Sequence, residues 1–210
     1  MILSFLLSFI LCPLLADDAK YAETMSKAIG QVYKAKAPEE IQQAVNTFER
    51  IGNAEKTKWE PFYYAAFGYI MMANQEQDGS KKDALLDQAA NHLQKASELR
   101  PNDSEIVTLE GFVSTVRLTV DPATRGQQYS AAAMQSFGKA LGLNPENPRA
   151  MGMMAQMQFG TARFFKSSTD EACATAMKAQ ALFAAPKSAT DPLAPAWGKG
   201  MVEGMLANCK

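Results

Sequence analysis

The sequence predicts an all-α protein of stacked, antiparallel helix pairs that ends in a capping helix. Alanine is abundant and β-branched residues are sparse, a composition that favours helix over strand. A pattern of small and bulky residues at helical spacing also returns along the chain, with its first alanines 45, 44 and 41 residues apart. Prolines just past several of these segments indicate where helices stop.

The recurring pattern places a small, a bulky and a second small residue on one helix face, four and then three positions apart. The small residues let a neighbouring helix approach closely, and the bulky residue fills the space beside it. The two clear copies are Ala89, Leu93, Ala96, Pro101 and Ala133, Phe137, Ala140, Pro145. The two weaker copies are Ala44, Phe48, Ile51 and Ala174, Lys178, Ala181, Pro186.

A partner helix precedes three of these copies, and in each a bulky residue stands four positions before a small one. These pairs are Tyr64 and Gly68, Val107 and Gly111, and Met151 and Ala155. Together the two patterns resemble the tetratricopeptide repeat over most of residues 57–186. The resemblance implies helix pairs stacked into a curved solenoid that acts by binding. Because the copies exceed the usual repeat of about 34 residues, we expect extended loops at 74–82 and 121–128.

We expect one helical domain over residues 17–210, with Asp103 and Thr169 as helix N-caps. The expected helix pairs span 18–53, 58–98, 103–142 and 147–185. Within them we place helices near 18–35, 38–53, 58–75, 80–98, 103–119, 126–142, 147–164 and 169–185. The last helix, at 193–208, is expected to cap the stack through an apolar stripe of Trp197, Met201 and Met205.

The first 16 residues form an uncharged apolar run that ends at Ala16 and is too short to span a bilayer. This run predicts a secretory signal cleaved after Ala16, and hence a periplasmic or secreted protein with no transmembrane segment after cleavage. No Lys or Arg precedes the run, so an uncleaved anchor and a misplaced start remain alternatives. Lipidation at Cys12 is a further alternative, although Ile10 and Leu11 are large for a lipidation site.

Two cysteines, Cys173 and Cys209, remain after removal of the signal, and an even pair in an exported chain indicates a disulfide. Cys173 lies near the start of one expected helix and Cys209 at the end of the next, and antiparallel packing brings those ends together. Two free thiols or a metal site are the alternatives.

In tetratricopeptide arrays the first helix of each pair lines the concave surface. Transferring that geometry predicts a concave groove, rich in aromatic residues and poor in charge, that serves as the binding site. Its expected residues are Phe62, Tyr69, Met72, Thr108, Phe112, Thr115, Arg149, Gln156 and Phe159. The alternative is that another helix, such as the N-terminal one, covers these side chains.

The sequence shows no recognisable Ser/His/Asp or Cys/His catalytic set. The single histidine, His92, has no nucleophile pattern beside it, and we expect no metal and no cofactor. The methionines at 151, 153, 154 and 157 are expected to pack in the core; a pliable binding surface or a copper site are the alternatives. The net charge of −1, without a basic cluster, gives no sign of nucleic-acid binding.

The sequence therefore predicts an exported scaffold, not an enzyme, that binds a protein or peptide partner in the cell envelope. One alternative is an accessory protein that binds a small or carbohydrate ligand. Another is an enzyme whose carboxylates converge only in the fold.

Overall fold

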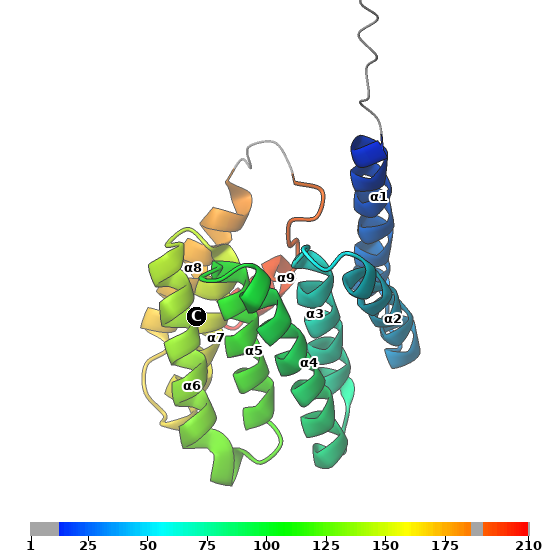
Figure 1. Cartoon of the computed structure of the whole chain (residues 1–210). Coiled ribbons are helices and arrows are strands. Elements are labelled where there is room, and N and C mark those ends of the chain that lie inside the picture. The colour runs from blue at the N-terminus through cyan, green and yellow to red at the C-terminus, as the bar shows by residue number, and fades with distance from the viewer. Residues whose placement is uncertain (1–12, 186–190, 210) are drawn as a thin grey trace, which may run out of the picture.

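The computed structural model describes residues 13–185 and 191–209, and in these parts of the chain it contains helices and no strands (Figure 1). The predicted all-α fold is confirmed. The helices are α1 (Pro13–Lys34), α2 (Pro38–Ala54), α3 (Glu60–Gln75), α4 (Gly79–Leu99), α5 (Ser104–Leu118), α6 (Pro122–Leu143), α7 (Pro148–Phe164), α8 (Asp170–Ala184) and α9 (Lys199–Leu206).

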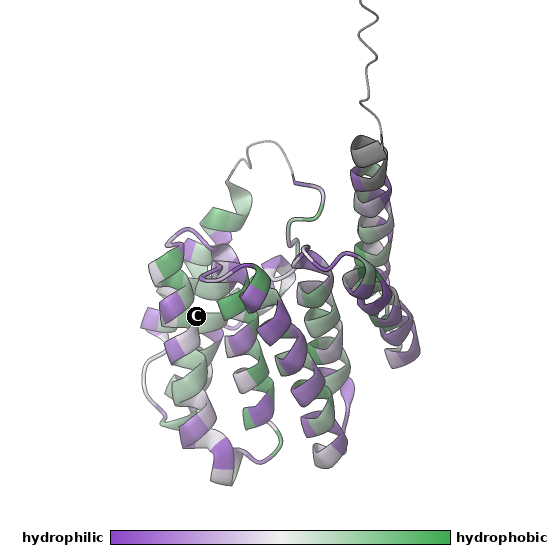
Figure 2. Cartoon of the chain, viewed as in Figure 1, coloured by the Kyte–Doolittle hydropathy of each residue, from purple (hydrophilic) through white to green (hydrophobic). Residues whose placement is uncertain are grey.

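The helices form four antiparallel pairs, α1–α2 to α7–α8, that stack side by side with α9 against α7 and α8. The first helices of the pairs also contact one another, α1 with α3, α3 with α5, and α5 with α7. The first helices of the pairs, α1, α3, α5 and α7, therefore form the inner layer and their partners α2, α4, α6 and α8 the outer layer, as in a tetratricopeptide solenoid. In Figure 2 the outer helices α2 and α4 carry long stretches of hydrophilic residues.

Side-chain caps and prolines set the helix boundaries. The Asp103 carboxylate accepts hydrogen bonds from the amides of Glu105 and Ile106, which confirms this N-cap. Thr169 occupies the N-cap position of α8 but makes no side-chain cap hydrogen bond. The extended loops expected at 74–82 and 121–128 are wrong, because α3 ends at Gln75 and α4 begins at Gly79. The surplus residues instead lengthen α4 and α6, to 21 and 22 residues.

The recurring small and bulky residues build the core, as the spacing predicts. The side chains of Ala89, Leu93, Ala96, Ala133, Phe137 and Ala140 are all buried. At Gly111 an added Cβ would lie only 2.4 Å from the Phe137 ring, and at Gly68 only 2.4 Å from Val45. The absence of a side chain at these two glycines is therefore what lets the neighbouring helices approach.

The structure shifts the register of the last copy of the pattern by two residues. Ala174, Lys178 and Ala181 face solvent, whereas Ala172, Ala176 and Ala179 are buried at the same spacing of four and three. The prediction for this copy is therefore wrong, and the error has a simple cause, because alanines occur at 172, 174, 176, 179 and 181. With alanine at both candidate registers, the local sequence does not distinguish the buried face.

The capping helix is shorter than predicted. α9 begins at Lys199, and residues 191–198, which we call the C-terminal arm, are not helical. Pro192 and Pro195 interrupt helical hydrogen bonding there, and Gly198 has a φ of 102° that favours glycine. Trp197 consequently belongs to the arm and not to the apolar stripe of the cap, where Met205 is buried.

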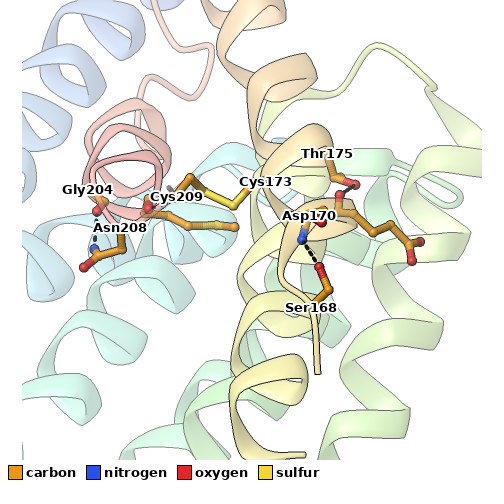
Figure 3. The surroundings of a disulfide bond; sticks show 9 residues. Ser168, Asp170, Cys173, Thr175, Gly204, Asn208 and Cys209 are labelled. Atoms are coloured by element: carbon orange, nitrogen blue, oxygen red, sulfur yellow. Dashed lines mark hydrogen bonds between the residues drawn. A yellow bond between two sulfur atoms is a disulfide. The ribbon is translucent and has the colours of Figure 1, made fainter. Parts of the chain in front are cut away.

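A disulfide joins Cys173 of α8 to Cys209, just past α9, with a Cα–Cα distance of 5.9 Å (Figure 3). The predicted pairing is confirmed. Nearby, the Asp170 amide donates to the Ser168 hydroxyl at the start of α8, and the Asn208 amide donates to the Gly204 carbonyl at the end of α9. The bond closes a loop that contains the whole C-terminal arm.

The first 12 residues, and with them most of the expected signal, lie outside the described residues. The described helix α1 starts at Pro13, so cleavage after Ala16 would remove its first residues. Within the described parts of the chain, no helix combines the length and the apolar character needed to cross a membrane.

Candidate functional site

The C-terminal arm lies across the inner layer of helices, where a tetratricopeptide array would present its groove. Side chains from three inner helices bind the arm's backbone. The Tyr64 hydroxyl of α3 donates to the Leu193 carbonyl at 2.7 Å, and the Arg149 guanidinium of α7 donates to the Pro195 carbonyl at 3.0 Å. The Ala196 amide donates to the Tyr33 hydroxyl of α1 at 3.1 Å.

The arm buries every second side chain against the inner helices. Leu193, Pro195 and Trp197 are buried, whereas Ala194 and Ala196 are exposed. The arm begins with a turn, in which the Ala194 amide donates to the Asp191 carbonyl, and the alternation shows that one side of the arm faces the inner helices. The arm therefore occupies the inner face in the manner of a bound peptide.

Trp197 anchors the arm at the centre of the stack. Its indole ring stacks between Phe67 of α3 and Phe112 of α5, with ring centroids 5.5 and 5.7 Å away. The indole Nε1 donates a hydrogen bond of 2.8 Å to the Tyr63 hydroxyl. Buried aromatic stacking together with a satisfied polar group makes this a stabilising contact.

A buried ion pair supports the same region. The Arg149 Nε and Nη2 atoms each donate to a carboxylate oxygen of Glu105 at 2.6 Å, which links α7 to α5. The remaining guanidinium nitrogen, Nη1, reaches the arm at Pro195. A fork of this geometry fixes the relative position of both helices and the arm.

The nine predicted groove residues do not form one open groove. Six are buried, namely Phe62, Tyr69, Met72, Thr108, Phe112 and Arg149, and three are half-buried, namely Thr115, Gln156 and Phe159. The alternative, in which another part of the chain covers these side chains, describes the structure better. In the central part of the inner face the cover is the C-terminal arm and not the N-terminal helix, because Trp197 and Pro195 contact Phe112 and Arg149.

The other predicted groove residues on α3 and α5 bind neighbouring helices. Phe62 and Tyr69 stack on the two sides of His92 of α4, with centroid distances of 6.2 and 5.6 Å. Thr108 donates a hydrogen bond to the Ser104 carbonyl within α5, and the side-chain amide of Asn147, the N-cap of α7, donates to the hydroxyls of both Ser104 and Thr108. Phe62 and Tyr69 therefore join α3 to α4, and Thr108 joins α5 to the start of α7, so all three are closed to a ligand.

His92 is a structural residue. Its Nε2 lies 3.0 Å from the Glu49 carboxylate of α2, which also accepts a hydrogen bond from the Tyr69 hydroxyl at 2.9 Å. Burial lowers the pKa of His92, and the hydrogen bond with Glu49 only partly opposes this effect. Among the described residues, no three His, Cys, Asp or Glu side chains are placed to hold a metal ion.

An open groove lies on the outer side of the stack between α4 and α5, and sequence reasoning missed it. This outer groove has a volume of about 420 Å³ and is lined by Ala90, Leu93, Gln94, Ser97, Glu98, Glu110 and Val113. Burial raises the pKa of Glu110, and the charge of Lys139 opposes that effect. The two carboxylates make this groove unfavourable for an anionic ligand.

A second exposed feature is the turn between α7 and α8, which we call the aromatic turn and define as residues 163–166. Its sequence is Arg-Phe-Phe-Lys, and Phe164 and Phe165 are 80% and 71% exposed. Their rings meet edge to face with centroids 5.1 Å apart. Sequence reasoning also missed this site, although two consecutive phenylalanines between basic residues at a helix end were a signal.

The fold resembles those of two solved structures. The HusA haemophore from Porphyromonas gingivalis superposes with a TM-score of 0.81 and is 32% identical, over 90% of this chain and 92% of that one. A thermophilic tetratricopeptide protein of Thermus thermophilus has a TM-score of 0.55 and 16% identity, over 80% of this chain and 86% of that one. No protein-family model matches the chain, and neither does any curated protein sequence.

The paired helices, the small-residue contacts between them and the occupied inner face define a tetratricopeptide-like helical protein. Within that class, identity and coverage of nearly both complete chains show that the chain belongs to the family of the HusA haemophore.

Proposed function

We propose that this protein binds haem as an exported carrier and catalyses no reaction. The observation that supports the proposal is the 32% identity to a protein described as a haemophore, which extends over almost the whole of both chains. Haem is a small ligand, so this proposal ranks the alternative of a small-molecule binding protein above that of a protein-binding scaffold.

The chemistry of haem sets what the protein must offer. Haem is a flat, largely apolar macrocycle with two carboxylate side chains, and it needs an apolar surface with cations nearby. The single histidine is not an open iron ligand, because His92 is buried between two rings and its Nε2 contacts Glu49. Binding through contacts with the macrocycle, without a histidine–iron bond, is therefore the mode that we propose.

Export follows from the same proposal. A carrier that collects haem outside the cell must leave the cytoplasm, and the Cys173–Cys209 disulfide is typical of an oxidising compartment. We propose that the N-terminal apolar run is a secretory signal cleaved after Ala16. Mass spectrometry of the protein recovered from the expressing cell's envelope and medium tests this, since an intact mass that retains Met1 would contradict it.

Haem titration of the purified protein tests the function. Haemin added in increments is expected to shift the Soret absorbance band and to quench tryptophan fluorescence to a saturable end point. The matched variant His92→Gln is expected to retain this binding. A wild-type protein whose spectra do not saturate, or which binds no more haemin than an unrelated helical protein in the same buffer, would refute the proposal.

A second candidate is recognition of a protein or peptide partner in the cell envelope at the inner face. It is favoured by the hydrogen bonds from Tyr64 and Arg149 to carbonyls of the arm, because contacts of this kind bind any extended backbone. A labelled peptide of residues 191–198 should then bind a Leu193→Ala/Trp197→Ala variant more tightly than the wild-type protein. Equal, weak binding to both would remove this candidate.

A further inference from the structure

The aromatic turn exposes the two most accessible aromatic side chains in the described parts of the chain. Every other described aromatic residue is buried or half-buried, so the exposure of Phe164 and Phe165 is not a general property of this surface. Adjacent exposed aromatic rings on an exported protein usually mark a binding site.

The backbone holds this turn in one conformation. The Ser167 amide donates to the Ala162 carbonyl, and the Lys166 amide donates to the Arg163 carbonyl. This pair of hydrogen bonds is the Schellman ending of a helix, in which glycine usually takes the left-handed position. Here Lys166 takes it, with φ 54°. The two rings and the lysine are therefore presented by an ordered, hydrogen-bonded segment.

Two cations flank the rings. The Arg163 guanidinium lies 5.9 Å from the centre of the Phe159 ring, which holds the arginine along α7. Among the ion pairs of the described residues, none involves Arg163 or Lys166. Asp170 and Glu171 follow at the start of α8, where the Glu171 carboxylate accepts a hydrogen bond from Gln158.

We propose that the aromatic turn is the porphyrin-docking site of this protein. This inference rests on the proposed haem-binding function and assigns it a place. Because the two rings are perpendicular, with an interplanar angle of 89°, the flat macrocycle stacks on the face of one phenylalanine and meets the edge of the other. Its two carboxylates reach Arg163 and Lys166. Aromatic stacking and charge-assisted hydrogen bonding then supply the two interactions that haem requires.

The other surfaces of the described chain fit this ligand less well. The inner face is occupied by the C-terminal arm, and the outer groove presents the carboxylates of Glu98 and Glu110 to an anionic ligand. A flat anionic membrane would meet Asp170 and Glu171 as well as the two cations. A single molecule with two carboxylates can place both of them on the cations alone.

Haemin titration of matched variants tests the assignment. Phe164→Ala/Phe165→Ala is expected to weaken haemin binding about tenfold or more. The loss of little more than one aromatic contact is enough to lower an affinity about tenfold. Met177→Ala, which trims an exposed side chain on α8 that is 56% exposed, is the control and should leave the affinity unchanged. Because all three side chains are exposed, the melting temperatures of both variants should stay within about 2 °C of wild type.

The charge contacts are tested separately with the dimethyl ester of protoporphyrin, whose carboxylates are blocked. Arg163→Gln/Lys166→Gln should weaken binding of free protoporphyrin several-fold, and more at low salt, yet leave binding of the ester unchanged. Equal loss for both ligands would contradict the placement of the carboxylates.

The outcomes separate the two proposals. If the wild-type protein binds no haemin, the proposed function is wrong. If the wild-type protein and the double alanine variant bind haemin equally well, the proposed function stands and only the docking site is wrong. Sedimentation of the ligand-free proteins and of mixtures with anionic vesicles completes the test. If the phenylalanines prove necessary only for self-association or for vesicle binding, the porphyrin assignment is wrong.

Discussion

The substitution Gly111→Ala tests the contact on which the helix pairing depends. Gly111 lies on α5 and faces Phe137, a fully buried ring on α6. An alanine Cβ at this position would lie 2.4, 2.8 and 3.0 Å from three atoms of the ring. Since ordinary carbon–carbon contact is near ~3.5 Å, the ring would have to recede by about 1 Å within a packed core.

The expected cost follows from two opposing effects. Overpacking of a well-packed core costs about 1–3 kcal/mol, and contact with three atoms of a rigid, buried ring lies at the upper end of that range. Replacing glycine by alanine within a helix stabilises it by about 1 kcal/mol. We expect a net loss of about 2 kcal/mol, which corresponds to a melting temperature about 4–8 °C lower for a domain of this size.

Gly138→Ala is the matched control, because it makes the same chemical change on the neighbouring helix α6. Nothing lies within 4 Å of a Cβ added at Gly138, so only the helix-propensity gain remains, and the melting temperature should rise by about 2–4 °C. Differential scanning calorimetry of both variants gives the comparison. A Gly111→Ala protein as stable as Gly138→Ala would refute the idea that a missing side chain is required where α5 meets α6.

Three further predictions concern the arm, the histidine and the disulfide. Trp197→Ala should lower the free energy of unfolding by about 3–5 kcal/mol in urea titrations, because it removes a buried ring that stacks on two others and leaves a cavity. A loss below about 1 kcal/mol would show that the arm is not part of the core. Burial lowers the pKa of His92 below its usual 6.5, so the unfolded state binds the proton more readily and stability should fall as the pH drops below about 6.5. His92→Gln should flatten this fall between about pH 7 and 5, and an unchanged profile would exclude His92 as its source. Reduction of the Cys173–Cys209 bond, which closes a loop with a sequence separation of 36, should cost roughly 4 kcal/mol by loop entropy; the Cys173→Ser/Cys209→Ser variant should melt at the same temperature with and without reductant.

The sequence predicted the helix pairing because the contact between helices needs particular side-chain sizes. A bulky residue such as Phe137 can be buried only where the facing helix offers space, and glycine at 111 provides that space. The same reasoning gave the wrong register in α8, where alanines at both 172 and 174 left two faces equally suitable. Spacing is informative only where large and small residues alternate unambiguously.

The binding surface was harder to predict than the fold. Assigning Phe112 and Arg149 to an open groove assumed that nothing covers the inner helices. Trp197 covers Phe112 and Pro195 accepts a hydrogen bond from Arg149, yet both arm residues lie far away in the sequence. The exposure of Phe164 and Phe165 is likewise a property of how α7 ends against α8, and the basic residues on either side of them were the one local signal of it in the sequence.

By itself, the sequence determined the all-helical class, the pairing of the helices and the disulfide partners. These depend on short-range spacing and on side-chain volume, which can be examined along one helix at a time. The tertiary structure alone decided which surfaces remain accessible, since access depends on what a distant segment covers. The C-terminal arm fills the inner face through Trp197 and leaves the aromatic turn open, and only the folded chain brings these two facts together.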